Sequence, residues 1–490
     1  MATRIVQGGP GAAGAPAVDA ELIEEARRIF DLQRERRRGA EPPSAEERIA
    51  RLKRFRDAVA AHREELAAAM RADFHKHPTE TELTEVQQTL GEIRHAIRHV
   101  RRWMRPKRVG TPALLVGTRS EIRYEPRGTV LILGAWNYPV LLTMTPLVAA
   151  VAAGNTVVVR PSEKTPAVNV VLGRIVADVF PEHEVALVGG GVEVADALLR
   201  LPFDHFFFTG STAVGRKVMH AAAEHMASVT LELGGKSPAI VDASASVERA
   251  AERIAWGKFI NGGQTCVAPD YVLVHESREA ELLEALRRSV EAFYGDTAEA
   301  RRRSESFSRM IDDGAFARVA ALLEESVAAG ARVEVGGETD AAARYVAPTV
   351  LSRVTWEMPV MEEEIFGPVL PVLTFRSLDD VLERINARPR PLALYVFARD
   401  SAAADRVLRR TTAGGSVVND VVIHLANPDL PFGGVGESGQ GSYHGWSGFR
   451  TFSHERAVLV RGRFSPAHLL HPPYTDRVRR LAALVGRVVG

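Results

Sequence analysis

Between Gly128 and His225, short apolar runs alternate with helical patterns, and this alternation constrains the fold more than any other feature of the chain. Runs of strand length occur at 129–133, 156–160, 184–188 and 204–208, and helical patterns occur at 167–179, 192–199 and 216–225. Strands separated by helices at this spacing pair in parallel, with helices on both faces of the sheet. The segment therefore predicts a doubly wound α/β domain.

A second alternating region follows and contains the only cysteine of the chain, Cys266. Strands are expected at 239–241 and 271–274 and near Val333, Val350, Leu370 and Leu394, with helices at 247–259 and 278–294. Residues 17–105 are expected to be helical, because apolar side chains recur there at helical intervals. The periodicity of residues 111–126 indicates neither a helix nor a strand. The chain thus predicts two α/β domains.

Composition excludes several classes of partner. The 490 residues include 62 Lys and Arg and 61 Asp and Glu, so no nucleic-acid partner is expected. The most apolar stretch, 139–159, is interrupted by Pro146 and Gly154 and predicts a buried helix and strand rather than a membrane span. We expect no stable membrane insertion, and single-cysteine usage fits a cytoplasmic location. The first 18 residues are expected to be a disordered lead-in.

Cys266 lies in the sequence Asn-Gly-Gly-Gln-Thr-Cys-Val-Ala-Pro-Asp-Tyr (261–271). A lone thiol cannot form an internal disulfide, and no cluster of histidines nearby predicts a metal site. Small residues leave room for a substrate beside a thiolate and bring backbone N–H groups close to a developing oxyanion. The alternative is an inert cysteine in the core.

Two segments that follow strands predict contacts with a nucleotide. Glu163 could accept a hydrogen bond from a ribose hydroxyl and Arg160 could bind a 2′-phosphate, or both lie in an exposed polar loop. Gly210, Ser211 and Gly215 lie where a strand passes into a helix, and a helix N-terminus attracts phosphate. The alternative there is a plain tight turn.

Two further residues suit acid–base and oxyanion chemistry. Glu232 ends an apolar segment, and burial would raise its pKa into the range of a general base, whereas exposure would make it a strand-end charge. Asn137 follows a strand and is either a helix cap or an oxyanion donor. Turn-rich segments at 363–368 and 431–439 remain without a role from spacing alone.

From about residue 20 to 470 these motifs resemble the aldehyde dehydrogenase superfamily. Within it, Gly-Gln-Thr-Cys-Val-Ala-Pro-Asp (263–270), Pro-Phe-Gly-Gly-Val-Gly (431–436), Gly-Ser-Tyr-His-Gly (441–445) and Thr-Phe-Ser-His (451–454) resemble the class 3 branch and its bacterial coniferyl-aldehyde-type relatives. The resemblance implies a Rossmann-like cofactor domain (19–110 and 128–236) and a catalytic domain (237–449). It also implies a small bridging or oligomerisation β element (111–127 and 450–465), followed by a C-terminal tail (466–490).

The resemblance also implies roles for individual residues. Cys266 is the nucleophile, Asn137 an oxyanion donor and Glu232 the general base. The expected cofactor contacts are Arg160 and Glu163 with the adenosine ribose, Gly210, Ser211 and Gly215 with the pyrophosphate, Glu364 with the nicotinamide ribose, and Phe366 beside it.

The implied function is NAD(P)-dependent oxidation of an aromatic or medium-to-long aliphatic aldehyde to the acid, through a thiohemiacetal and a thioester on the cysteine. Most relatives have lysine where Arg160 stands, so both NAD and NADP are allowed. Glu232 favours hydrolysis over transfer to coenzyme A. An acylating dehydrogenase and a non-catalytic structural protein are the alternatives, and a homodimer is expected.

Overall fold

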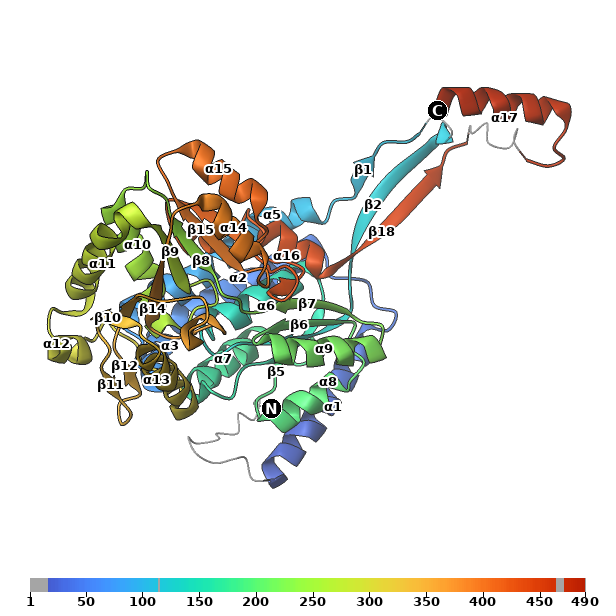
Figure 1. Ribbon diagram of the computed structural model, residues 1–490. Helices are drawn as coiled ribbons and strands as arrows, with labels where there is room; N and C mark the ends of the chain where they lie inside the picture. Colours follow the sequence, from blue (N-terminus) through green and yellow to red (C-terminus); the bar gives the residue numbers. More distant parts are fainter. Residues whose placement is uncertain (1–15, 113–114, 464–470, 490) are drawn as a thin grey trace.

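The computed structural model describes residues 16–112, 115–463 and 471–489, and its strands form two large sheets, a small hairpin and a projecting arm. Figure 1 shows the two sheets with their helices as the body of the molecule and the arm leaving that body. The expected mixed α/β architecture with parallel sheets is confirmed.

The first sheet has six strands in the order β17-β7-β6-β3-β4-β5, and only the edge strand β17 is antiparallel. Its strands are β3 (Thr129–Leu133), β4 (Thr156–Arg160), β5 (Val185–Leu187), β6 (His205–Thr209), β7 (Ser228–Glu232) and β17 (Gly439–Gln440). Alternate residues of a strand point to opposite faces, so β3 sends Val130 and Ile132 into one core and Leu131 and Leu133 into another. The strands are therefore buried on both faces, as a parallel sheet requires.

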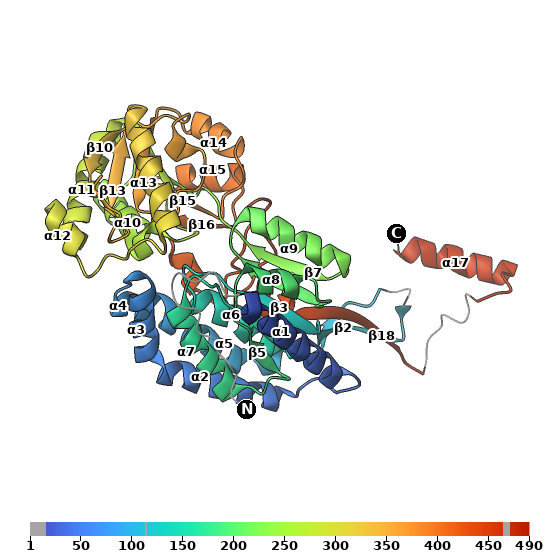
Figure 2. The ribbon, with the colours of Figure 1, turned by 90° about the horizontal axis from the view of Figure 1, so that it is seen from below.

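Helices of this half cover both faces of the six-stranded sheet (Figures 1 and 2). The first core packs against α2 (Ala45–Ala61), α5 (Gln87–Trp103), α6 (Leu141–Ala153) and α7 (Pro166–Val179). The second core packs against α1 (Pro16–Arg37), α8 (Val192–Leu199) and α9 (Thr212–Glu224). The expected lead-in falls mostly outside the described residues, and α1 already begins at Pro16.

The second sheet has seven strands in the order β10-β13-β14-β9-β8-β15-β16, with only β10 antiparallel to its neighbour. They are β8 (Pro238–Val241), β9 (Tyr271–His275), β10 (Arg332–Val335), β13 (Thr349–Ser352), β14 (Val369–Phe375), β15 (Ala393–Phe397) and β16 (Gly415–Val418). One face packs against α10 (Val247–Phe259) and α11 (Glu279–Tyr294). The other packs against α13 (Asp313–Ala328), α14 (Leu378–Asn386) and α15 (Ser401–Arg410).

Shorter elements connect these layers. They are α3 (Arg63–Phe74), α4 (Pro78–Thr81), the π-helical turn η1 (Glu82–Val86), α12 (Ala298–Arg303), the hairpin of β11 (Thr339–Asp340) and β12 (Tyr345–Val346), and α16 (Gly445–Thr451). None of the helices in the described part of the chain combines the length and apolar character needed to cross a bilayer.

The arm is a three-stranded antiparallel sheet of β1 (Lys107–Val109), β2 (Thr118–Pro126) and β18 (Ser453–Arg461). β18 pairs with β2 from Ser453 opposite Pro126 to Arg461 opposite Thr118, although more than 300 residues separate them. Figures 1 and 2 show the arm extending from the body, with α17 (Asp476–Val489) at its far end. Such a non-local pairing leaves no local periodicity, which is why residues 111–126 carried no assignment.

Candidate active site

A cavity of about 1010 Å³ lies between the two large sheets. On one side it is lined by residues that end or follow β3, β4, β6 and β7, that is, by the carboxyl edge of the six-stranded sheet. This edge is where parallel α/β sheets bind ligands. On the other side it is lined by Lys236, Cys266, Glu364 and Phe366, which precede strands β8, β9 and β14 of the second sheet. The second sheet therefore contributes its amino edge.

Cys266 is held at the cavity by a tightly turned loop. Asn261, Gly262 and Gly263 have φ values of 54°, 61° and 77° in succession, a left-handed conformation that favours glycine. A Cβ atom on Gly263 would lie 2.3 Å from the carbonyl oxygen of Gly367, so no side chain fits there. Burial, with the nearby carboxyls of Glu364 and Glu232, raises the pKa of the Cys266 thiol to about 12. The thiol is protonated at neutral pH in this environment.

Asn137 approaches this loop from the six-stranded sheet. Its side-chain Nδ2 donates a hydrogen bond of 3.1 Å to the carbonyl oxygen of Gln264, and Asn261 Nδ2 donates one of 2.8 Å to the carbonyl oxygen of Asn137. The interpretation of Asn137 as a helix cap is wrong, because α6 begins only at Leu141 and its first N–H groups bond elsewhere. The amide lies instead beside the turn that carries Cys266.

Glu232 is the last residue of β7 and only 3% exposed. Neither of its carboxyl oxygens has a hydrogen-bond partner among the described residues, and burial raises its pKa well above the usual range. An exposed strand-end charge is thereby excluded. An unpaired buried carboxyl is costly to fold, and a carboxyl with so perturbed a pKa at a cavity is a candidate functional residue.

The six-stranded sheet with its helices forms one lobe of the molecule, and the seven-stranded sheet with its helices forms the other. Glu364 and Phe366 lie on a loop that contacts both lobes. A Cβ atom on Gly234 would lie 2.0 Å from Glu364 Oε2, so the glycine lets the carboxyl approach the chain after β7. Burial, and after it the negative charge of Asp270, raises the pKa of Glu364 to about 8. The Oε1 atom of Glu364 has no partner among the described residues. Arg318 donates a 2.6 Å hydrogen bond to the carbonyl oxygen of Ile365 and so fixes the loop from α13.

Arg160 is anchored more firmly than the sequence indicates. Its Nη2 donates hydrogen bonds of 2.9 Å to the carbonyl oxygens of Gly190 and Gly191 and lies 2.8 Å from Glu163 Oε2. The Arg160 side chain is 9% exposed and that of Glu163 is 41% exposed. The segment is therefore not an exposed polar loop throughout: the guanidinium is buried and the carboxylate faces the cavity.

Gly210 and Ser211 line the cavity at the N-terminus of α9, whereas Gly215 does not. Ser211 caps the helix by accepting a hydrogen bond from the N–H of Val214. Gly215 lies on the buried side, where a Cβ atom would be 2.8 Å from Leu233, so it permits close packing of α9 on the chain after β7. The expected role of Gly215 in the pyrophosphate turn stays a prediction.

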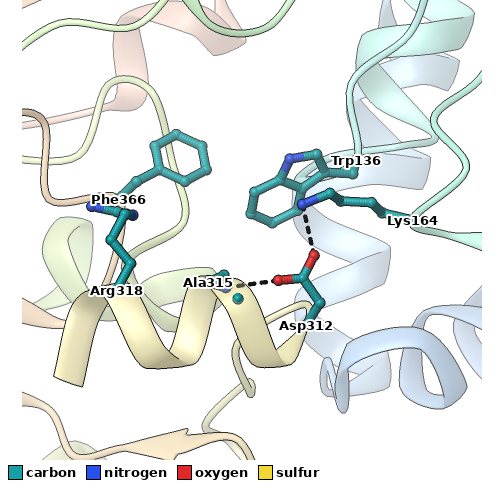
Figure 3. Close-up of a pocket in the computed structure, with 7 residues that line it drawn as sticks. Trp136, Lys164, Asp312, Ala315, Arg318 and Phe366 are labelled. Atoms are coloured by element: carbon teal, nitrogen blue, oxygen red, sulfur yellow. Dashed lines mark hydrogen bonds and ion pairs between the residues drawn. The ribbon is translucent and has the colours of Figure 1, made fainter. Parts of the chain in front are cut away.

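Figure 3 shows a smaller pocket of about 420 Å³ that is lined from both lobes and shares Trp136, Lys164, Arg318 and Phe366 with the large cavity. Lys164, from the loop after β4, lies 2.6 Å from Asp312, which caps α13 through the N–H of Ala315. Trp136, from the loop after β3, makes an edge contact with Phe366 at 5.4 Å between ring centres. An ion pair and an aromatic pair thus bridge the lobes at this pocket.

Sequence reasoning missed a second set of residues that support the site. Lys236 donates hydrogen bonds of 2.6 Å to Asp270 and 2.8 Å to the carbonyl oxygens of Val360 and Glu363. Asp270 in turn accepts from the N–H of Ile365. Asp270 stands inside the quoted cysteine motif, four residues after Cys266, and Lys236 lies four residues after Glu232, and that proximity was the available signal.

The cavity fits a nicotinamide dinucleotide. Its lining includes the Glu163 carboxylate and the anchored Arg160 guanidinium, Ser211 at the N-terminus of α9, and Glu364, whose Oε1 has no partner among the described residues. Carboxylates accept from ribose hydroxyls, and a helix N-terminus attracts a pyrophosphate.

The cleft lies between two parallel α/β sheets, and a lone thiol and an unpaired carboxyl are among its lining residues. Such a cleft is typical of cofactor-dependent oxidoreductases. A sequence model described as the aldehyde dehydrogenase family matches residues 13–458. The chain belongs to the aldehyde dehydrogenase family and is an enzyme that oxidises aldehydes.

Individual relatives agree with this assignment and with the class 3 and coniferyl-aldehyde-type resemblance. A Pseudomonas aeruginosa protein named "Probable coniferyl aldehyde dehydrogenase" is 41% identical, covering 94% of this chain and 96% of its own. "Aldehyde dehydrogenase, dimeric NADP-preferring" of Canis lupus familiaris is 40% identical, covering 94% and 99%. The substrate-bound state of Staphylococcus aureus AldH superimposes with a TM-score of 0.89 at 40% identity, covering 94% and 99%.

Proposed function

We propose that the chain oxidises its aldehyde through a covalent thioester on Cys266, which water then hydrolyses with Glu232 as the base. The observation that carries the proposal is the meeting of Cys266, Glu232 and Asn137 at one cavity. Three different segments supply them, and no structural need explains an unpaired buried carboxyl beside the only thiol of the chain.

In the first half of the reaction, the Cys266 thiol gives up its proton to solvent, the sulfur of the resulting thiolate adds to the aldehyde carbon, and the carbonyl oxygen becomes an oxyanion. The amide of Asn137 carries two N–H donors, of which one bonds to Gln264 and the other is left for this oxyanion. The backbone N–H of Cys266 is the second donor. A bound nicotinamide supplies the acceptor for the hydride that leaves the thiohemiacetal carbon as the thioester forms.

In the second half, Glu232 takes a proton from water as that water attacks the thioester carbon. The carbon–sulfur bond breaks, the proton on Glu232 passes to the departing sulfur, and the carboxylic acid leaves, so that Cys266 is a thiol and Glu232 a carboxylate again. A pKa raised by burial makes the Glu232 carboxylate a stronger base once it has lost its proton. Its burial also keeps bulk water from the thiohemiacetal before oxidation.

The residues that would hold the cofactor set its preference. Glu163 is placed for the adenosine ribose, Gly210 and Ser211 for the pyrophosphate, and Glu364 with Phe366 for the nicotinamide end. We propose that NAD is preferred and NADP accepted. Support comes from the Arg160–Glu163 ion pair, since a paired guanidinium binds a 2′-phosphate less well and the carboxylate repels it.

We further propose that an aromatic or medium-to-long aliphatic aldehyde enters from the side opposite the cofactor. Another cavity, of about 250 Å³, has both apolar lining residues (Leu141, Leu425 and Ala426) and charged ones (Glu92, Arg94 and Arg98). Phe432 lines the large cavity and stacks on His444 of the second one at 5.4 Å. Tyr443 lies near both cavities. Its pKa is raised first by burial, then by Glu232 and Cys266, which line the large cavity, and by Glu92, which lines the smaller one. The aromatic and aliphatic side chains between the two cavities would contact an apolar tail.

We propose a homodimer, and the exposed arm supports it. The domain boundaries expected from the sequence are likewise proposals. Val109, Leu459 and Val460 are exposed on the arm, where a second copy could cover them. Light scattering that gives the mass of a single chain at micromolar concentration would contradict the dimer.

The proposed reaction is tested by absorbance at 340 nm with aromatic and aliphatic aldehydes, NAD or NADP, and coenzyme A present or absent. We expect full turnover without coenzyme A and release of the free acid. Turnover that depends on coenzyme A would identify an acylating dehydrogenase instead.

A further inference from the structure

A fully buried lysine, Lys76, lies between two carboxyls that the reaction does not use. Its Nζ is 3.2 Å from Glu85 Oε1 and 3.8 Å from Glu80 Oε1, and it lies 4.0 Å from the ring centre of Tyr138. Lys76 precedes α4, Glu80 lies within it, and Glu85 lies in the π-helical turn η1. Single π-helical turns inside helices are frequent at functional sites.

Each carboxyl holds one of the two segments that meet at the reactive centre. Glu85 Oε2 accepts hydrogen bonds of 3.0 and 2.9 Å from the N–H groups of Val140 and Leu141, just after Asn137. Glu80 Oε1 accepts one of 2.9 Å from the N–H of Asn261, the first left-handed residue of the loop that leads to Cys266.

A third contact joins the same two segments directly. Tyr138, which stacks under the Lys76 ammonium, shares a 2.8 Å hydrogen bond between its hydroxyl and Thr265 Oγ1. Thr265 is the residue before Cys266. The lysine thus connects, through two carboxyls and one ring, the segment that carries Asn137 and the loop that carries the thiol.

We propose that Lys76, Glu80 and Glu85 are positioning residues that fix the distance between the Asn137 amide and Cys266. This inference rests on the proposed function, since that distance matters for an oxyanion on a cysteine adduct. Misplacing a catalytic group by about 1 Å costs on the order of 100-fold in rate. Burial makes the arrangement costly to break. A carboxyl that lost the ammonium would be left without its partner in an apolar site.

The test compares Lys76→Met with Lys76→Arg and with a control, Arg51→Met. The control removes a different ion pair, Arg51 with Glu184 at 2.5 Å, which is only partly buried and does not involve the segments of Asn137 and Cys266. We expect Lys76→Met to lower kcat about 10- to 100-fold with the KM for NAD changed less than twofold. Lys76→Arg should recover part of the loss, and Arg51→Met should lower only Tm. A kcat within twofold of wild type for Lys76→Met would overturn the inference.

Two readouts separate positioning from general destabilisation. In a double-mutant cycle, Glu80→Gln should cost much less in kcat when Asn137 is already alanine, because both act on one oxyanion, and additive losses would contradict this. Hydrogen exchange of the amides at 261–266 should speed up in Lys76→Met and not in Arg51→Met. That readout needs no turnover, so an inactive wild-type enzyme would end the proposed function, while unchanged exchange would end this inference.

Discussion

The side-chain nitrogen of Asn137 lies 3.1 Å from the carbonyl oxygen of Gln264, two residues before Cys266. Asn137 and Gln264 are 127 positions apart and come from opposite lobes. This bond brings an amide donor to the turn that carries the thiol, and it joins the carboxyl edge of one sheet to the amino edge of the other.

Replacing Asn137 by alanine tests the oxyanion assignment. We expect kcat to fall about 100- to 1000-fold, the usual cost of one lost oxyanion donor, with the KM for NAD nearly unchanged. The turn itself should persist, because Asn261 Nδ2 also donates to the carbonyl oxygen of Gln264 at 3.2 Å. Steady-state kinetics and the melting temperature are measured together. A kcat within threefold of wild type would remove Asn137 from the mechanism.

The pH dependence of alkylation tests the electrostatics around Cys266. With a pKa of about 12, roughly one thiol in 10⁵ is ionised at pH 7, so the rate with iodoacetamide should rise about tenfold per pH unit without a plateau below pH 10. Because Cys266 is the only cysteine, Cys266→Ser is a complete control. A plateau near pH 8 would mean that the thiol is far less perturbed.

Glu364→Gln should change that profile in a defined direction. The Glu364 carboxyl has a pKa of about 8, so below pH 7 it is mostly neutral and the variant should react at nearly the wild-type rate. Above pH 9 the wild-type carboxylate disfavours the thiolate, and its removal should lower the pKa of Cys266 and accelerate labelling. A ratio of rates that stays constant from pH 6 to 10 would contradict the coupling.

Glu163→Gln tests the proposed preference for NAD. The change removes the carboxylate that pairs with Arg160 and repels a 2′-phosphate, so kcat/KM for NADP relative to NAD should rise about five- to tenfold, or roughly 1 kcal/mol. Glu182→Gln is a matched control, because Glu182 forms an exposed ion pair with Arg28 at 2.9 Å outside the cavity. An unchanged ratio would show that Glu163 does not face the adenosine ribose.

Local patterns predicted several elements around both large sheets. Strands 129–133 and 156–160 and helices 192–199 and 247–259 have the bounds expected from the sequence, because buried parallel strands and amphipathic helices leave strong short-range signals. The cavity-lining positions Arg160, Ser211 and Glu232 follow from the rule that parallel strands end at one edge.

Long-range contacts were beyond the sequence. Nothing near Lys76, Glu80 or Glu85 shows that a helical segment reaches loops 55 to 181 residues away. Arg160 donates to the backbone carbonyl oxygens of Gly190 and Gly191. A backbone acceptor leaves no signal in the sequence, so this contact could not be predicted. Gly215 has the spacing of a phosphate turn, yet its packing on Leu233 decides its place.

The central claim is a thioester on Cys266 that Glu232 resolves, and trapping that thioester tests it most directly. Glu232→Gln is mixed with NAD and an aldehyde, absorbance at 340 nm is followed, and the protein is digested and mapped by mass spectrometry. We predict a burst of about one reduced cofactor per subunit, then a stall, with the acyl mass on Cys266. Continued turnover at the wild-type rate, or an acyl group on any other residue, would contradict the account.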